Sequence, residues 1–171
     1  MYHGTDIDSA KAICALQKAD VNKGSKKVDF GPGFYLTDDY EKAVQWAHRK
    51  SIVRMKSAAV LTVDFDIEAA RDLIEEFEED IRWGRFIINN RNGIKYIDRV
   101  PFKDNNLDAR YSITHGRVAD IDVVNYANEL NESGKMLDSV ERILNREYAM
   151  QYAFHTEEAI SYIRKYVYQN V

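Results

Sequence analysis

The sequence predicts an α+β domain, and three observations support this prediction. The run from Ala58 to Asp66 alternates and is rich in β-branched residues, which is typical of a strand. Helix-like segments of unequal length lie on either side of it, most with Asp, Ser or Thr at the expected capping position. The sequence has neither an internal repeat nor a glycine-rich nucleotide loop, so it does not favour a regular doubly wound sheet. We expect one domain over residues 1–171, because this length and a hydrophobic share of 45% suit a single core.

Residue patterns give the expected elements in order. The first half should contain a strand at 1–5, a helix from Asp8 or Ser9 to about Lys18, a loop at 21–29, a strand at 33–36, and a helix capped by Thr37, Asp38 or Asp39 that ends at 48–50. The second half should contain a strand at 58–66, an acidic helix at 67–81, a helix at 83–92, an irregular stretch at 94–109, a strand at 110–115, helices at 120–132 and 137–145, a strand at 147–155, and a helix at 157–168.

Composition narrows the classes of protein that fit. The net charge of −4 argues against a surface that binds nucleic acid over its whole extent. Cys14 is the single cysteine, so no disulfide framework forms and a reducing compartment is expected. No apolar run approaches the roughly 18 residues needed to span a bilayer. The opening Met1-Tyr2-His3 leaves no room for a signal peptide, so we expect a cytoplasmic protein without membrane contact.

Several reaction classes find no support in the residue pattern. The four histidines and one cysteine lack metal-ligand spacing, so no metal is expected. Cys14 lies in an apolar helical pattern, which favours a buried small hydrophobe over a reactive thiolate. No Gly-x-Ser-x-Gly elbow is present, and the carboxylates cluster on one segment rather than forming a separated acid–base pair.

Three motifs contain the candidate site residues apart from Trp46: Tyr2-His3-Gly4-Thr5, DFGPGFYLT at 29–37, and MQYAFHT at 150–156. Taken singly, each residue has an ordinary explanation, such as packing for an aromatic on a strand. In this order they resemble the motifs of the ADP-ribosyltransferase superfamily, in the branch of diphtheria-type toxins and poly(ADP-ribose) polymerases. They are still more similar to a family of small bacterial proteins known only as a domain of unknown function. The stretch ITHGRVAD at 113–120 extends that similarity over nearly the whole chain.

The resemblance implies an NAD site. His3 would hydrogen-bond the adenosine-side ribose, Gly4 would hold the nicotinamide amide through its backbone N–H and C=O, and Thr5 would support the ribose or the turn. Tyr35 would stack on the nicotinamide ring. Trp46, eleven residues later, would close the other side of that ring. Such stacking is worth about 0.5–1.5 kcal/mol beyond the buried area.

The glycine turn and nearby cations complete the expected binding site. Gly31 and Gly33 flank Pro32, and glycine lets a backbone turn sharply or approach a ligand closely. The diphosphate of NAD requires positive partners, and solvated surface cations are the ordinary alternative explanation for each candidate. The candidates are Lys23, Lys26, Lys27, Arg49 and Arg117.

Gln151 falls where the better-known enzymes place a catalytic glutamate. That glutamate stabilises the cationic sugar as nicotinamide leaves, whereas a glutamine supplies a hydrogen bond but no charge. By analogy with a lost oxyanion donor, the loss costs on the order of 10²–10³ in rate. Polymer extension is therefore not expected. Slow single-unit transfer, use of another acid such as Glu147, and binding without turnover stay open. His3, Tyr35 and Gln151 are the expected catalytic residues.

The resemblance therefore implies an ADP-ribosyltransferase fold with a split, bent mixed sheet, and mono-ADP-ribosyl transfer from NAD to a macromolecule. The acidic net charge favours a protein over a nucleic acid as acceptor. The resemblance also implies a bacterial intracellular toxin with a small antitoxin protein, or a phage-defence effector. Three alternatives stay open. They are an NAD glycohydrolase on the same fold, a non-catalytic module that binds NAD or ADP-ribose, and an interaction protein whose acidic segment 68–80 meets a basic partner.

Overall fold

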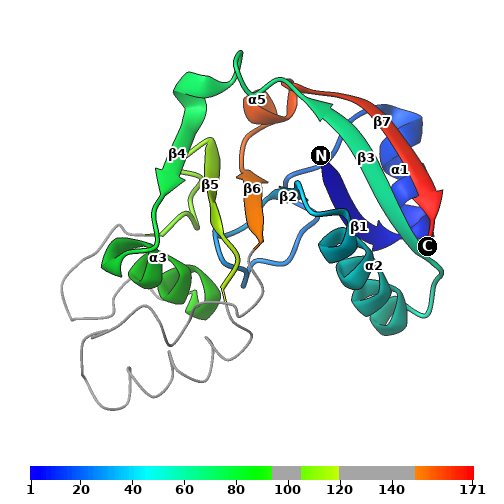
Figure 1. The fold of residues 1–171 in the computed structure, drawn as a ribbon, viewed down its shortest axis with the longest axis horizontal. Helices are drawn as coiled ribbons and strands as arrows, with labels where there is room; N and C mark the ends of the chain where they lie inside the picture. Colours follow the sequence, from blue (N-terminus) through cyan, green and yellow to red (C-terminus); the bar gives the residue numbers. More distant parts are fainter. Residues whose placement is uncertain (94–104, 120–148) are drawn as a thin grey trace.

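The computed structural model describes residues 1–93, 105–119 and 149–171. Seven strands in these ranges form one mixed sheet in the order β4-β5-β6-β2-β1-β3-β7 (Figure 1). Neighbouring strands are antiparallel except for the parallel pair β4 and β5. The strands are β1 (Tyr2–Asp6), β2 (Phe34–Thr37), β3 (Ala58–Phe65), β4 (Ile74–Phe77), β5 (Ile113–Arg117), β6 (Met150–Phe154) and β7 (Ile163–Asn170). This architecture agrees with the α+β prediction.

The α-helices in the described ranges begin at side-chain caps. A capping oxygen accepts a hydrogen bond from a backbone N–H that has no partner within the helix. Asp6 accepts from Ser9 in this way, and Asp39 accepts from Lys42. The helices are α1 (Ile7–Leu16), α2 (Tyr40–Arg54), α3 (Ile81–Asn92), the single turn α5 (Glu157–Ile160), and a 3₁₀ turn, η1 (Arg71–Leu73).

Helices α1 and α2 cover opposite faces of the part of the sheet formed by β1, β3 and β7 (Figure 1). Successive residues of a strand point to opposite faces, and β3 shows this alternation. Leu61 packs in the same cluster as Ala10 of α1. Val60 packs with Ala43 and Ala47 of α2. Strand β3 is therefore apolar on both faces and lies between the two helices.

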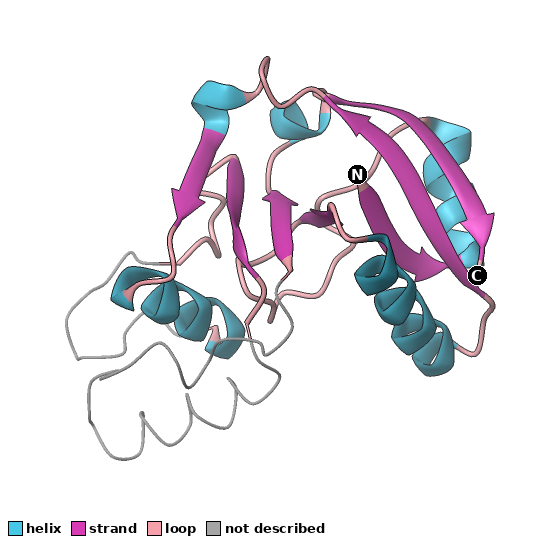
Figure 2. Ribbon diagram, viewed as in Figure 1, coloured by secondary structure: helices cyan, strands magenta, loops and turns pink. Residues whose placement is uncertain are grey.

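The sheet is split between β1 and β2. These strands share one register pair, Tyr2 with Thr37. By contrast, β1 pairs with β3 along its whole length, from Tyr2 with Thr62 to Asp6 with Ala58. The two halves of the sheet therefore diverge directly after the first rung (Figure 2). His3 and Gly4 follow Tyr2 and lie on the edge of this split.

The predicted acidic helix at 67–81 is wrong. The segment forms η1 and then β4, which pairs with β5. Ile74 packs into one apolar cluster and Phe77 into another. Glu75 forms an ion pair with Arg82, and the guanidinium of Arg82 lies over the Phe77 ring at 4.5 Å. Burial of the two apolar residues on opposite sides of the strand outweighs the helix propensity of the glutamates.

The predicted helix at 157–168 is also wrong beyond its first turn, because β7 occupies most of it. Ile163 and Tyr166 are its buried residues, three positions apart, which imitates a helical period. A β-bulge produces this spacing. Lys165 has φ of 53°, and the β3–β7 register shifts beside it. Strict alternation would have identified a strand.

The remaining predictions differ from the structure mainly at element ends. Asp6 rather than Asp8 or Ser9 caps α1, and α2 continues past the basic run to Arg54. The predicted helices at 120–132 and 137–145 lie outside the described residues, as does most of the irregular stretch at 94–109.

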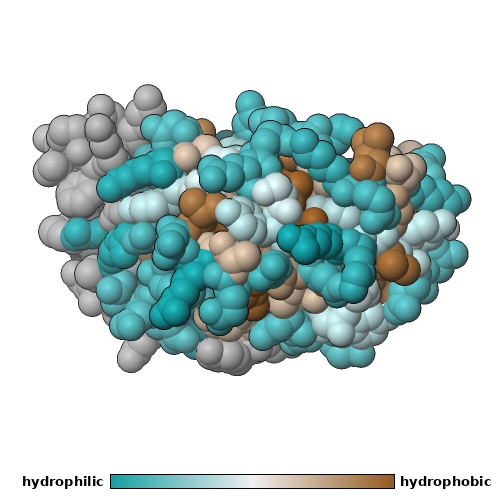
Figure 3. Space-filling view, turned by 90° about the horizontal axis from the view of Figure 1, so that it is seen from above, coloured by the Kyte–Doolittle hydropathy of each residue, from teal (hydrophilic) through white to brown (hydrophobic). Residues whose placement is uncertain are grey.

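The described surface is largely polar. On the face shown in Figure 3, hydrophobic residues form small separate patches among hydrophilic ones. The most exposed large apolar side chains include Ile52, Val53 and Met55 near the end of α2. Within the described ranges, every helix is too short or too polar to cross a lipid bilayer.

Candidate functional site

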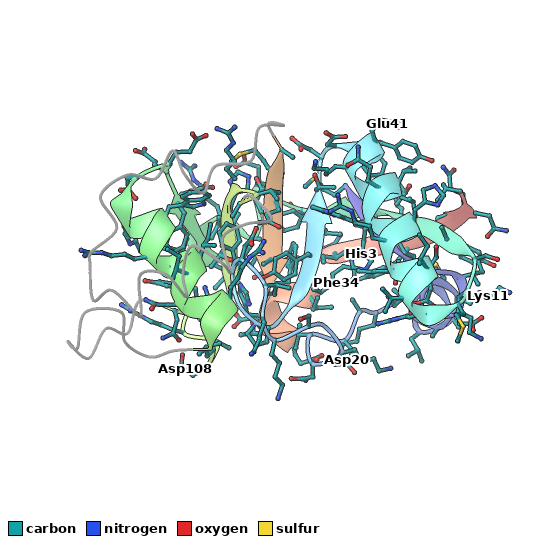
Figure 4. The ribbon with its side chains drawn as sticks, turned by 90° about the horizontal axis from the view of Figure 1, so that it is seen from below. His3, Lys11, Asp20, Phe34, Glu41 and Asp108 are labelled. Atoms are coloured by element: carbon teal, nitrogen blue, oxygen red, sulfur yellow. The ribbon has the colours of Figure 1, made fainter. Side chains whose placement is uncertain are left out.

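A hydrogen bond bridges the split in the sheet. Nδ1 of His3 on β1 lies 2.6 Å from the backbone carbonyl oxygen of Tyr35 on β2. A carbonyl oxygen can only accept, so Nδ1 carries the proton and Nε2 holds the lone pair. The His3 ring also stacks on Phe34, with 4.4 Å between ring centroids (Figure 4). The structure thus brings together the first two motifs, which lie about thirty residues apart.

His3 is neutral at physiological pH. Burial is the main reason why the pKa of His3 lies well below its ordinary value, and the neighbouring Lys50 ammonium lowers the pKa further. Lys50 reaches from α2 and lies 3.4 Å from Nε2 of His3. This places the lysine as the donor and the imidazole as the acceptor. A neutral imidazole with a fixed tautomer can accept a hydrogen bond from a hydroxyl group of a ligand.

Gly4 is required by the packing of α2. A Cβ atom at this position would lie 2.0 Å from the carbonyl oxygen of Ala43 and 2.7 Å from the backbone nitrogen of Ala47. The Gly4 carbonyl oxygen also accepts a hydrogen bond of 2.7 Å from Lys50. A ligand amide that binds this carbonyl, as the resemblance implies, must therefore share it with Lys50 or displace the ammonium.

Tyr35 fastens the glycine turn. Its hydroxyl donates to the Gly31 carbonyl at 2.7 Å and accepts from the Phe30 N–H at 3.0 Å. Burial raises the pKa of Tyr35 well above its ordinary value, and the nearby Asp29 charge adds to the effect. The phenol therefore stays protonated. The ring packs against the cluster that contains Phe30 and is half-buried. A role in stacking on nicotinamide stays a prediction.

Gln151 lies in the buried interior, where it is 3% exposed. Its amide nitrogen donates to Oδ2 of Asp29 at 2.8 Å. The same oxygen accepts from the Ala119 N–H at 3.0 Å, and Oδ1 forms an ion pair with Arg91. Gln151 therefore holds Asp29, the last residue of the loop at 21–29, in place. Glu147, the alternative acid, lies outside the described residues.

Gly33 and His155 hold the other end of the turn. A Cβ atom on Gly33 would lie 2.6 Å from the Phe154 carbonyl oxygen, so glycine permits the close approach to β6. Nδ1 of His155 donates to the Pro32 carbonyl at 2.6 Å, and Nε2 lies 2.9 Å from the Thr114 hydroxyl. Burial lowers the pKa of His155 to about 4, so the ring is neutral.

The other predicted site residues have less definite roles. Thr5 is buried on β1 opposite Ala59. Trp46 is half-buried on α2, one helical turn before Lys50, so the two side chains share a ridge of the helix. The predicted phosphate partners Lys23, Lys26, Lys27 and Arg49 are exposed. Arg117 forms an ion pair with Glu79 on the β4 side of the sheet.

Two surface hollows lie along β4, away from the split. One, of about 480 Å³, is lined by Glu76, Phe77, Arg117 and Met150 among others, and the second by residues of the β3–β4 connection and β4. In the described part of the chain, no group of three or more His, Cys, Asp or Glu side chains is placed to hold a metal ion.

Sequence reasoning missed Lys50 and Asp29. Lys50 belongs to the basic run 48–50, in which nothing marks the one lysine that turns toward the sheet. A helical projection from Ala43 and Ala47 would have placed it beside the buried face. Asp29 ends a polar loop, and its buried ion pair with Arg91 spans 62 positions, which no local pattern can indicate.

A protein-family profile described as "Protein of unknown function (DUF3990)" matches residues 1–165. The chain belongs to this family. Membership in DUF3990 confirms the resemblance to a family of unknown function. That description assigns no activity, so the likeness to ADP-ribosyltransferases stays a prediction. No curated protein and no solved structure matches this DUF3990 chain.

Proposed function

We propose that the chain binds NAD at the split between β1 and β2 and transfers ADP-ribose to a macromolecule. The main support is the hydrogen bond from His3 to the Tyr35 carbonyl. It joins two of the three motifs and leaves Nε2 of a neutral imidazole as an acceptor, where a ribose hydroxyl would replace the Lys50 ammonium. Lys50 and Trp46 on α2 lie beside the same split and supply a cation and an aromatic ring.

The proposed reaction breaks the bond between the anomeric carbon of the ribose and the nicotinamide nitrogen. A nucleophilic oxygen or nitrogen of the acceptor forms the new bond to that carbon and loses its proton, and neutral nicotinamide leaves. Positive charge develops on the sugar in the transition state, so a nearby negative charge would stabilise it. Gln151 carries none, and the Asp29 carboxylate beside it is paired with Arg91. The cationic transition state would be only weakly stabilised by charge, which supports slow transfer of single ADP-ribose units.

Binding without turnover is the second candidate. The buried Gln151 amide supports it, because one of its N–H groups already bonds Asp29 and the side chain is 3% exposed. Hydrolysis of NAD, with water as the acceptor, is the third outcome that the experiment below separates. A small antitoxin protein as partner stays a prediction from the resemblance.

The test uses NAD labelled in its adenylate part, incubated with the purified chain and a bacterial lysate. Wild type is compared with His3→Ala and Tyr35→Phe, and His48→Ala serves as a matched control because His48 is exposed on α2. Transfer predicts label on a macromolecule that His3→Ala abolishes and His48→Ala leaves intact.

Other results of this experiment would support one of the alternative functions or refute the site. Free ADP-ribose without macromolecular label would identify a glycohydrolase. Saturable NAD binding with no nicotinamide release after long incubation would identify a binding module. Equal labelling by wild type and His3→Ala would refute the proposed site.

A further inference from the structure

Lys50 carries a positive charge that no described carboxylate neutralises. Its ammonium contacts the Gly4 carbonyl oxygen at 2.7 Å and Nε2 of His3 at 3.4 Å, and both are neutral acceptors. Among the described carboxylates, the charge of Asp6 acts on the Lys50 ammonium and raises its pKa. Asp6 is already engaged by Arg54 at 2.5 Å and by both the hydroxyl and the N–H of Ser9.

An unpaired ammonium in a partly buried position is costly for a folded protein. Buried charges are normally paired or bind an ion, because the dielectric inside a protein solvates them poorly. Burial accordingly lowers the pKa of Lys50 to about 8, and the neighbouring Arg54 charge contributes. The group is still mostly protonated at neutral pH. The split thus presents one net positive charge beside the acceptor atom of His3.

We propose that Lys50 binds the diphosphate of the dinucleotide. This assignment rests on the proposed function, and it differs from the exposed lysines that the sequence favours. The ammonium of Lys50 is carried by a flexible four-carbon side chain. It can therefore leave the Gly4 carbonyl oxygen and bind a phosphate oxygen close by. That exchange frees the Gly4 carbonyl for an amide N–H of the ligand. One movement of the Lys50 side chain would therefore pair its buried charge with the diphosphate and free the Gly4 carbonyl oxygen for the ligand amide.

Isothermal titration calorimetry with three probes tests the proposal: ADP-ribose, inorganic diphosphate and nicotinamide. The variants are Lys50→Met, which keeps the length of the side chain, and Lys50→Arg, which keeps the charge. Lys56→Met is the matched control, because Lys56 is an exposed lysine that pairs with Asp8. Urea unfolding of each variant verifies that it is folded.

We expect Lys50→Met to weaken ADP-ribose and diphosphate binding by roughly tenfold or more, the usual contribution of a charge-assisted hydrogen bond. Lys50→Arg should retain most of the affinity, and Lys56→Met all of it. Nicotinamide carries no phosphate, so its binding should not weaken in Lys50→Met.

Three results would overturn the assignment: unchanged ADP-ribose affinity in Lys50→Met, equal losses in Lys50→Met and Lys50→Arg, or no binding of either phosphate probe to wild type. The proposed function is judged separately, by nicotinamide release from NAD. If wild type releases nicotinamide and Lys50→Met binds ADP-ribose normally, the function stands and the role of Lys50 fails. If diphosphate binding depends on Lys50 and NAD is neither bound nor consumed, the anion site stands and the proposed function fails.

Discussion

The side-chain amide of Gln151 donates a hydrogen bond of 2.8 Å to Oδ2 of Asp29, and both residues are less than 5% exposed. The donor and acceptor come from β6 and from the loop before β2, which are 122 positions apart. An amide is the neutral group that matches a buried carboxylate here. A glutamate at this position would place two carboxylates in contact.

Gln151→Glu should destabilise the protein instead of activating it. At pH 7 we expect a loss of roughly 1–3 kcal/mol in the free energy of unfolding, because the introduced carboxylate faces Asp29 and leaves a lone pair unmatched. The loss should shrink as the pH falls and the introduced carboxyl group becomes protonated. Urea unfolding at several pH values measures both effects.

A double-mutant cycle controls this prediction. When Asp29→Asn is added to Gln151→Glu, the combined loss should be smaller than the sum of the two single losses by about 1 kcal/mol or more. Additive losses would show that the two side chains do not interact as described.

Gly4→Ala should destabilise the packing of α2 on β1. The added methyl group would lie 2.0 Å from a backbone oxygen, and a helix backbone cannot rotate away as a side chain can. We expect a loss of roughly 3 kcal/mol or more in the free energy of unfolding. Gly93→Ala is the control, since its Cβ meets nothing within 4 Å and φ of 63° is the source of its cost, about 1 kcal/mol. Comparable losses in the two variants would contradict the close approach.

Stability should fall below neutral pH through His155. Its pKa is about 4 in the folded protein against an ordinary 6.5, so the unfolded chain binds more protons between these values. The contribution to stability is complete above pH 6.5 and is lost as the pH falls toward 4. It amounts to roughly 3 kcal/mol.

His155→Gln should flatten the dependence of the melting temperature on pH in this window, and His48→Gln should not. Some slope will persist, because the pKa of His3 is also lowered. An unchanged slope in His155→Gln would mean that this histidine is not buried as a neutral group.

Affinity for ADP-ribose should decline as the pH rises through about 8. Lys50 loses its proton there, and the groups around it are Arg54, Asp6 and His3. His3 is neutral throughout, and the pKa of Asp6 is lowered to about 2, so Lys50 is the group that titrates in this range. The decline should reach up to about tenfold per pH unit above the pKa. Calorimetry across this range would measure the decline. A flat profile in wild type, or a decline that persists in Lys50→Met, would refute the prediction.

Local patterns predicted the parts of the fold that depend on local physics. The alternation at Ala58–Phe65 and the capped start of α2 at Asp39 are readable because strand periodicity and caps involve near neighbours. The segments 74–77 and 163–170 were misread because contacts with distant strands decide them. In 163–170 a bulge at Lys165 spaces the buried residues like those of a helix. In 74–77 apolar residues on both faces of the strand give the same impression.

The candidate site was predictable to a similar extent. The motifs identified His3 and Tyr35, and the structure joins them across the split. They could not show that Gln151 faces Asp29 instead of the split, because that contact spans the chain. A helical projection separates Lys50 from the exposed His48 and Arg49, but only the position of α2 on the sheet shows that Lys50 contacts Gly4.

The turn at Gly31-Pro32-Gly33 has a kinetic consequence. Side chains from β2, the end of β6 and α3 hold it at the Gly31, Pro32 and Asp29 carbonyl oxygens, respectively. Its conformational entropy is therefore lost when the chain folds and not when a ligand arrives. An arriving molecule meets a preorganised wall, so association at this edge of the split should proceed without a slow loop-ordering phase.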